Sequence, residues 1–131
     1  SPEGMKNIVE KIQSTGNDSI LLTERGSCFG YHNLVVDMRS FPIMAELGYP
    51  VVFDGTHSVQ LPSSGKETGG ERKFIRPLVK AATAAGIDGL FLEIHPRPEL
   101  APCDSSNMLP LAELESLLRT ALAIKEAIKL S

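Results

Sequence analysis

Three segments of the chain repeat one plan, and this repeat limits the folds that the chain can adopt. In each segment a glycine is followed by a short apolar run and then by polar residues, with a cationic or imidazole side chain nine residues after the glycine. The apolar runs do not alternate with polar residues, which is typical of strands buried on both faces of a parallel sheet. The glycines and end residues are Gly16 and Arg25, Gly48 and His57, and Gly86 and His95; the expected strands are residues 20–22, 51–53 and 90–92.

Helical patterns occupy the intervals between the apolar runs, so helices and strands are expected to alternate, with right-handed crossovers. The first helix has Ser1 as its N-cap, Pro2 at its first position and Gly16 just after its end. The other predicted helices are residues 40–47, a helix that begins near Pro77 and ends before Gly86, and a helix from about Pro110 onward.

The predicted fold class is α/β, with one domain over residues 1–131. Three parallel strands cannot close into a barrel, and an open sheet of three strands leaves unpaired backbone groups at its edges. We therefore interpret the chain as part of a (β/α)8 TIM barrel whose other strands cover these edges. A small three-layer α/β domain is the alternative.

The composition narrows the classes of partner. The chain has 131 residues, 42% of them hydrophobic, and a formal net charge of -3, so neither a nucleic acid nor an anionic membrane surface is expected as its main partner. No apolar run reaches the roughly 18 residues of a membrane span, and the first residues do not resemble a signal peptide. Cys28 and Cys103 lack CxxC spacing and are expected to be reduced. We expect a cytoplasmic location and, without an initial methionine, a truncated chain.

Polar residues follow each apolar run, where parallel α/β folds build their active sites. The set that most suggests a reactive site is His57, Glu93 and Asp104, because an imidazole and two carboxylates can converge on a divalent metal ion. From the spacing alone, salt bridges and caps are the more common explanation of such a set.

Two further features favour ligand binding. Arg25 stands before Gly26 and offers a planar fork of donors to an oxyanion, although an ion pair with Glu24 or Asp54 would explain it as well. Residues 60–72 have no apolar periodicity and are rich in glycine and serine. We interpret them as a loop at the mouth of the site, either a lid or a plain connection.

A set of short motifs runs through almost the whole chain. They are Thr-Glu-Arg-Gly at 23–26, Asn-Leu-Val-Val-Asp at 33–37, Thr-His-Ser at 56–58, Gly-Gly at 69–70 and Leu-Pro-Leu at 109–111. In this order and spacing, the sequence resembles the 3-deoxy-D-manno-octulosonate 8-phosphate synthases.

The resemblance implies a barrel enzyme of lipopolysaccharide biosynthesis. Its reaction is the condensation of phosphoenolpyruvate with D-arabinose 5-phosphate, which gives 3-deoxy-D-manno-octulosonate 8-phosphate and phosphate. The chain would cover the part from the fifth helix, through the sixth, seventh and eighth strands, to the eighth helix. The missing half of the barrel or other subunits are then expected partners, and the family forms homotetramers. The chain by itself is expected to have negligible activity.

The same resemblance implies roles for individual residues. Arg25 is expected to hold the phosphate of phosphoenolpyruvate. His57, Glu93 and Asp104 are expected to bind a divalent metal such as Zn, Fe or Mn. The predicted catalytic residues are His57 and Asp54, and the further predicted substrate contacts are Ser58, Gln60 and Phe29.

Several alternatives stay open. Arg39-Ser40 and Asn107-Met108-Leu109 resemble the metal-dependent members of the family, whereas Cys103-Asp104 also occurs in the metal-independent branch. We favour metal dependence. The competing functions are a related phosphoenolpyruvate-dependent sugar acid synthase, acting with erythrose 4-phosphate or in sialic-acid synthesis, and a non-catalytic half-barrel that acts as an assembly module.

Overall fold

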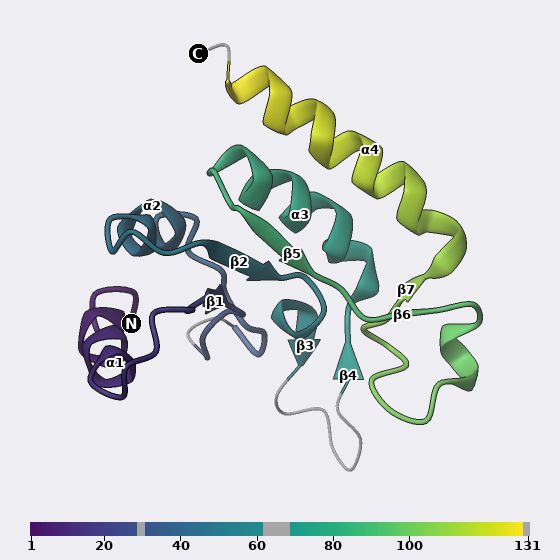
Figure 1. The fold of residues 1–131 in the computed structure, drawn as a ribbon. Helices are drawn as coiled ribbons and strands as arrows, with labels where there is room; N and C mark the ends of the chain where they lie inside the picture. Colours follow the sequence, from purple (N-terminus) through teal and green to yellow (C-terminus); the bar gives the residue numbers. More distant parts are fainter. Residues whose placement is uncertain (29–30, 62–68, 130–131) are drawn as a thin grey trace.

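The chain folds into alternating helices and strands, as the repeat predicts (Figure 1). The computed structural model describes residues 1–28, 31–61 and 69–129. The helices are α1 (Met5–Gln13), α2 (Ser40–Ala45), α3 (Ile75–Ala84) and α4 (Leu111–Ile128), and the strands of the main sheet are β1 (Leu22–Glu24), β2 (Val51–Asp54) and β5 (Gly89–Phe91).

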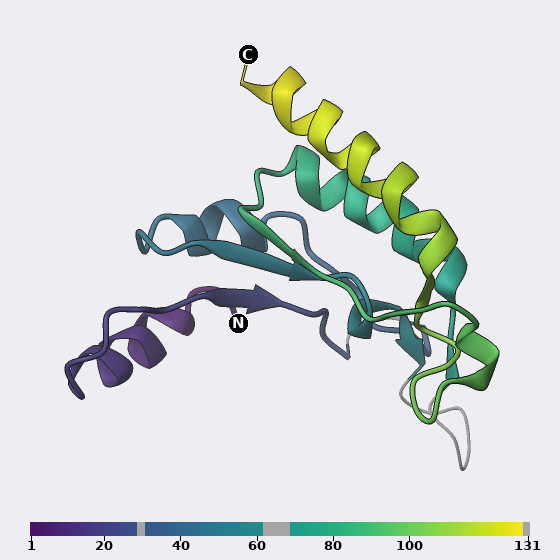
Figure 2. The same cartoon turned by 45° about the vertical axis from the view of Figure 1, so that its right-hand side comes forward.

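The main sheet is parallel, with β2 between β1 and β5. In its register Leu22 pairs with Val51, and Phe53 pairs with Leu90. Parallel pairing places the carboxyl ends of all three strands at one edge of the sheet. Figures 1 and 2 show that the shorter strands and the long loops gather at this same end of the molecule.

The first strand begins later than predicted. Residues 20–22 were expected to form it, but β1 starts at Leu22, whose amide donates to the carbonyl oxygen of Pro50 at 3.0 Å. The ladder with β2 then begins at Val51, because Pro50 has no N–H group to donate. The first helix likewise begins at Met5 rather than at Pro2, after a turn in which the amide of Gly4 donates to Ser1 Oγ.

The glycines of the repeat end the helices as predicted. Gly16, Gly48 and Gly86 have φ angles of 86°, 79° and 96°, in the left-handed region that side chains with a Cβ atom disfavour. Each turns the chain from a helix toward the next strand. This confirms the interpretation of the three glycines as helix-ending residues.

Short elements that the sequence did not predict surround the carboxyl edge of the sheet. An antiparallel pair of two-residue strands brings residues 60–61 and 69–70 to this edge, and a parallel pair brings residues 94–95 and 109–110. These elements are the strands β3 (Gln60–Leu61), β4 (Gly69–Gly70), β6 (Ile94–His95) and β7 (Leu109–Pro110), with the 3-10 helices η1 (His57–Val59), η2 (Arg72–Phe74) and η3 (Pro98–Leu100).

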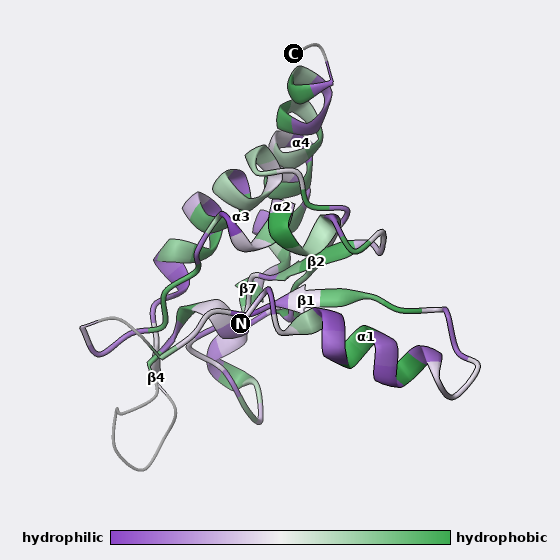
Figure 3. Ribbon diagram, turned by 90° about the vertical axis from the view of Figure 1, so that its left-hand side faces the viewer, coloured by the Kyte–Doolittle hydropathy of each residue, from purple (hydrophilic) through white to green (hydrophobic). Residues whose placement is uncertain are grey.

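The apolar core lies between the helices and the main sheet. Helix α2 packs on β1 and β2, and α3 packs on α4. The fully buried rings of Phe41 and Phe53 meet edge to face, with centroids 5.9 Å apart. Figure 3 shows the hydrophobic residues that run through α2 and β2.

Apolar side chains also remain exposed along both edge strands and the outer helix. Leu21 is 66% exposed beside β1, Phe91 is 46% exposed on β5, and Leu122 is 63% exposed on α4. In the part of the chain that the structure describes, the outer edges of β1 and β5 are not paired, so another protein segment could pack beside these side chains. Within the described residues, no helix combines the length and the apolar character needed to cross a membrane.

Replacing a core phenylalanine tests this packing. Phe53 is 0% exposed, so we expect Phe53→Ala to lower the free energy of unfolding of the native protein by about 3–5 kcal/mol in urea denaturation. Phe74→Ala is the matched control because Phe74 is 41% exposed; its expected loss is about 1 kcal/mol or less. Equal losses from the two variants would contradict the assignment of Phe53 to the core.

Candidate functional site

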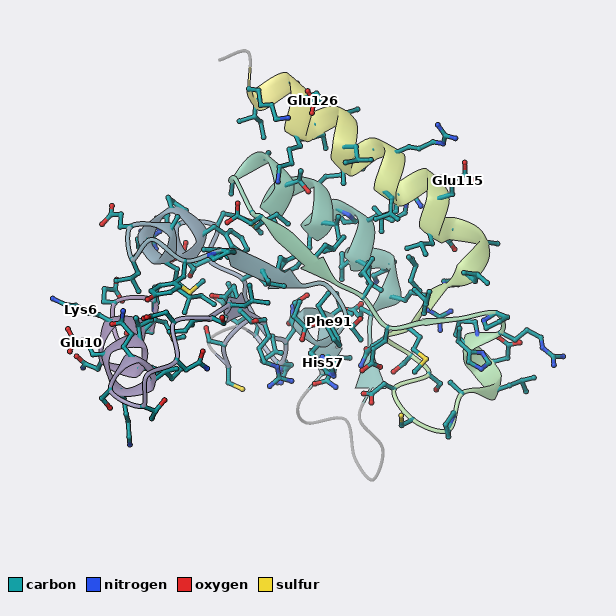
Figure 4. The ribbon with its side chains drawn as sticks, viewed as in Figure 1. Lys6, Glu10, His57, Phe91, Glu115 and Glu126 are labelled. Atoms are coloured by element: carbon teal, nitrogen blue, oxygen red, sulfur yellow. The ribbon has the colours of Figure 1, made fainter. Side chains whose placement is uncertain are left out.

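His57 is held in place by the carboxylate that ends β2. Asp54 Oδ1 accepts hydrogen bonds from the backbone amides of Thr56 at 3.0 Å and His57 at 2.9 Å, and Asp54 Oδ2 lies 2.7 Å from His57 Nδ1. Because a carboxylate only accepts, Nδ1 is the donor and Nε2 is left with its lone pair. Phe91 stacks on the imidazole ring with centroids 5.9 Å apart, and Figure 4 shows the two side chains together.

Glu93 reaches the same place from the end of β5. Its backbone amide donates to Oγ1 of the fully buried Thr56 at 2.7 Å, which ties the exit of β5 to the turn after β2. Its Oε1 lies 3.7 Å from His57 Nε2. Its Oε2 is buried and has no hydrogen-bond partner among the residues described.

Asp104 comes from the loop before β7. Its φ of 48° is in the left-handed region, and its carbonyl oxygen accepts from the amides of Asn107 at 2.8 Å and Met108 at 3.1 Å. Aspartate is one of the few residues that adopt this conformation readily. The tight turn carries the carboxylate toward Gln60, whose Nε2 donates to Asp104 Oδ1 at 2.9 Å.

The structure therefore brings together the three residues that the sequence singles out as a metal-binding set. One ligand atom each from His57, Glu93 and Asp104 lies within 4.8 Å of the other two, and all three residues are half-buried. A buried carboxylate oxygen such as Glu93 Oε2 needs a cation or a hydrogen-bond donor, and the described residues supply no donor to it. The group can thus hold a divalent cation.

Arg25 lies after β1 and is linked to this cluster. Its Nη2 donates to Gln60 Oε1 at 3.2 Å. In the ranges that the structure describes, Arg25 forms no ion pair with Glu24 or Asp54; Glu24 Oε1 accepts instead from the amide of Gly26. Arg25 is exposed, so its other N–H groups can bind an anion.

Ser58 does not join the cluster. Ser58 is 3% exposed, and its hydroxyl group has no partner in the described part of the chain. It lines an apolar cavity of about 460 Å³ next to Phe74 and Leu78, which none of the three candidate ligands lines. Phe29 and residues 62–68, most of the predicted loop, lie outside the described residues.

A separate ion pair lies on the surface before α2. Arg39 donates to both carboxylate oxygens of Asp37, at 2.6 to 3.0 Å. The side-chain hydrogen bond from Arg39 lowers the pKa of Asp37 below its ordinary value, and the same hydrogen bond raises the pKa of Arg39. Both side chains are exposed, and among the described residues no hydrogen bond or ion pair joins them to the cluster.

Comparison with known proteins agrees with this arrangement. A model of the DAHP synthetase I family matches residues 1–130. The chain belongs to this family. It is 54% identical to the 2-dehydro-3-deoxyphosphooctonate aldolase of Trichlorobacter lovleyi, and 55% identical to the proteins of that name from Pelobacter propionicus and Syntrophotalea carbinolica, over 130 residues in each case.

These alignments cover 98% of the chain but only 48%, 48% and 47% of the three relatives. The chain thus spans about half the length of the curated DAHP synthetase I family relatives that it matches. Their names confirm the resemblance to the octulosonate 8-phosphate synthases that the motifs indicate.

Some contacts of this DAHP synthetase I family chain were not predicted. The support of His57 by Asp54 was missed, although aspartate three residues before histidine at a strand exit is a recognisable signal. The bridge from Arg25 through Gln60 to Asp104 was also missed. It joins residues 35 and 44 positions apart, and no sequence pattern specifies such a contact.

Asp54→Asn tests the support of His57 in this family member. Oδ1 must remain an oxygen because two backbone amides donate to it, so the new NH2 group would face Nδ1. We expect the imidazole proton to move from Nδ1 to Nε2, as seen in nitrogen NMR spectra of the labelled ring. Asp88→Asn is the control, because Asp88 Oδ2 only accepts from the amide of Val51. An unchanged tautomer in Asp54→Asn would contradict the assignment.

Proposed function

We propose that this chain supplies the metal-binding and phosphate-binding part of a 3-deoxy-D-manno-octulosonate 8-phosphate synthase. The observation that carries the proposal is the convergence of His57, Glu93 and Asp104 at the carboxyl edge of the sheet. Arg25 stands beside them as an anion-binding group. The names of the relatives support the same assignment.

The reaction joins carbon 3 of phosphoenolpyruvate to the aldehyde carbon of D-arabinose 5-phosphate, while water adds at carbon 2. The aldehyde oxygen gains a proton, the added water loses its protons, and phosphate leaves as the carbon–oxygen bond breaks. This chemistry requires cations for two phosphates and one carboxylate, and a positioned water. When bound, a divalent cation supplies electrophilic assistance to the water or to the aldehyde oxygen.

The residues of the chain divide this work between binding and positioning. The free N–H groups of Arg25 bind the phosphate of phosphoenolpyruvate. Asp54 orients His57, because both of its oxygens already accept hydrogen bonds within the chain. In this proposal Asp54 is a positioning residue, whereas the sequence analysis expected it among the catalytic residues. One imidazole and two carboxylates are a donor set that suits Zn²⁺, Fe²⁺ or Mn²⁺.

We place the protein in the metal-dependent branch of the synthases. The buried Oε2 of Glu93 supports this assignment, since a donor to it is missing in the described chain. A metal-independent enzyme would be expected to satisfy that oxygen with a hydrogen-bond donor.

The proposed architecture is a (β/α)8 barrel, in which residues 1–131 form one partial domain from the fifth helix to the eighth helix. The unpaired edges of β1 and β5 and the exposed Leu21, Phe91 and Leu122 support further strands and helices at these surfaces. They come from the remainder of the polypeptide or from another subunit. We also propose a homo-oligomer and a cytoplasmic location, where phosphorylated sugars and phosphoenolpyruvate are held.

A steady-state assay of the native polypeptide tests the function. We expect phosphate release that requires both phosphoenolpyruvate and D-arabinose 5-phosphate, that stops on treatment with a chelator, and that returns when Mn²⁺ or Zn²⁺ is added. Glu93→Gln should lower kcat/KM by roughly a hundredfold or more. Glu115→Gln is the matched control, because Glu115 is exposed on α4 and lies far from His57 in Figure 4.

Two results would overturn different parts of this proposal. Absence of phosphate release with both substrates would reject the synthase function. Full turnover after chelation, with Glu93→Gln as active as Glu115→Gln, would retain the synthase and reject its metal dependence.

The 131-residue chain by itself should show negligible phosphate release. Among its described residues, we assign only Arg25 to anion binding, whereas the substrates carry two phosphates and a carboxylate. Circular dichroism would establish that the helices have formed before the assay. Turnover near that of the native polypeptide would show that the remaining strands are not needed for catalysis.

A further inference from the structure

The carboxamide of Gln60 lies between the candidate anion site and the candidate metal site. Its Oε1 accepts from Arg25 Nη2 at 3.2 Å, and its Nε2 donates to Asp104 Oδ1 at 2.9 Å. One side chain therefore touches a residue from the exit of β1 and a residue from the loop before β7. No other residue in the described ranges is shown with hydrogen bonds to both.

The orientation of this amide follows from its neighbours. A guanidinium group only donates hydrogen bonds, and a carboxylate only accepts them. The amide oxygen must therefore face Arg25 and the amide nitrogen must face Asp104. Reversing the amide would place an oxygen against a carboxylate and an NH2 group against a cation. The contact thus needs a side chain with an acceptor at one end and a donor at the other.

The backbone around Gln60 is held against the loop that carries Asp104. Gln60 pairs with Gly70 in the β3–β4 hairpin. A Cβ atom on Gly70 would lie 1.4 Å from Asn107 Oδ1, so the base of the hairpin sits directly on the fully buried Asn107. The backbone N–H of Asn107 in turn donates to the backbone carbonyl oxygen of Asp104.

A second contact strengthens the same junction. Arg72, just after the hairpin, donates to the carbonyl oxygen of Ser105, the residue that follows Asp104. The hairpin base and the Asp104 loop are therefore joined through backbone and side chains alike. These contacts tie the position of Gln60 closely to that of Asp104.

We propose that Gln60 is a positioning residue that couples anion binding at Arg25 to divalent-cation binding at Asp104. This inference rests on the proposed function for the identity of the two ligands. Arg25 has five N–H donors, so it can bind a phosphate while one of them stays on Gln60. A bound phosphate restricts the guanidinium, the guanidinium orients the amide, and the amide holds one oxygen of Asp104. The other oxygen is left for the cation.

The coupling has a measurable thermodynamic consequence. If phosphate favours the arrangement in which Asp104 is held, phosphate binding tightens cation binding, and cation binding tightens phosphate binding by the same factor. A glutamine that only touches substrate would change the affinity for phosphate and leave the affinity for the cation alone. The two roles therefore differ in the coupling factor, which is independent of turnover.

The test is a titration of the native polypeptide with Mn²⁺, in the presence and absence of inorganic phosphate and without either substrate. For the unaltered protein we expect phosphate to lower the Kd for Mn²⁺ by about fivefold or more. Gln60→Met fills the same space without the amide; it should raise the Kd for Mn²⁺ by about tenfold and bring the phosphate effect close to unity. Because phosphate also binds Mn²⁺ in solution, each Kd is calculated from the concentration of free Mn²⁺.

Gln13→Met is the matched control. Gln13 and Gln60 are the two glutamines of the chain, and Gln13 Nε2 also makes two side-chain hydrogen bonds, to Tyr49 and Asp18 on the exposed surface. It should bind Mn²⁺ and show the phosphate effect as the unaltered protein does. Thermal unfolding followed by circular dichroism verifies that both variants are folded at the titration temperature.

Gln60→Glu separates the two ends of the amide. It keeps an acceptor toward Arg25 and loses the donor toward Asp104, so the effect of phosphate on Mn²⁺ should disappear, and the added negative charge should also weaken phosphate binding. The proposal is overturned if Gln60→Met retains the coupling factor of Gln13→Met, or if phosphate has no effect on Mn²⁺ in the unaltered protein. Loss of synthase turnover would not affect this test, because neither substrate is present.

Discussion

The parallel pairing of β2 with both β1 and β5 is the constraint on which the rest of the structure depends. It gives the three strands one direction, so the residues after Glu24, Asp54 and Phe91 emerge at a common edge. The apolar runs make this pairing favourable because β2 is covered by helices and flanked by strands, and Val51 and Phe53 are almost completely removed from water. Polar side chains that are distant in sequence then become neighbours without any long side chain having to reach across the molecule.

At this edge, hydrogen bonds from neighbouring residues orient the side chains of the candidate metal site. Asp54 holds the imidazole of His57, Thr56 holds the backbone of Glu93, and Gln60 holds the carboxylate of Asp104. Each candidate ligand thus has a supporting partner, an arrangement that proteins use to orient metal-binding side chains. The cost of collecting negative charge in a half-buried place is consistent with a site that is completed by a cation.

The geometry of the candidate site lies within the described residues alone. The candidate ligand atoms lie within 4.8 Å of one another, although in this described part of the chain no further strand pairs with the outer edge of β1 or β5. The exposed Leu21 and Leu122 lie along those edges and on the outer helix, away from the strand exits. In the proposed barrel, the remaining strands therefore contribute the other phosphate-binding groups, while the metal ligands are positioned by local contacts.

The amino-acid sequence by itself determined the alternation of helices and strands, the glycines that end the helices and the three residues of the candidate metal-binding set. These features depend on apolar runs, on conformations that favour glycine, and on motifs shared with a family. The tertiary structure alone decided that Ser58 lines an apolar cavity, that Asp54 supports His57, and that Gln60 joins Arg25 to Asp104. Such contacts depend on how separate segments pack and on which way each side chain turns. A residue pattern covers only a few neighbouring positions, so it does not specify contacts between segments that are far apart in the sequence.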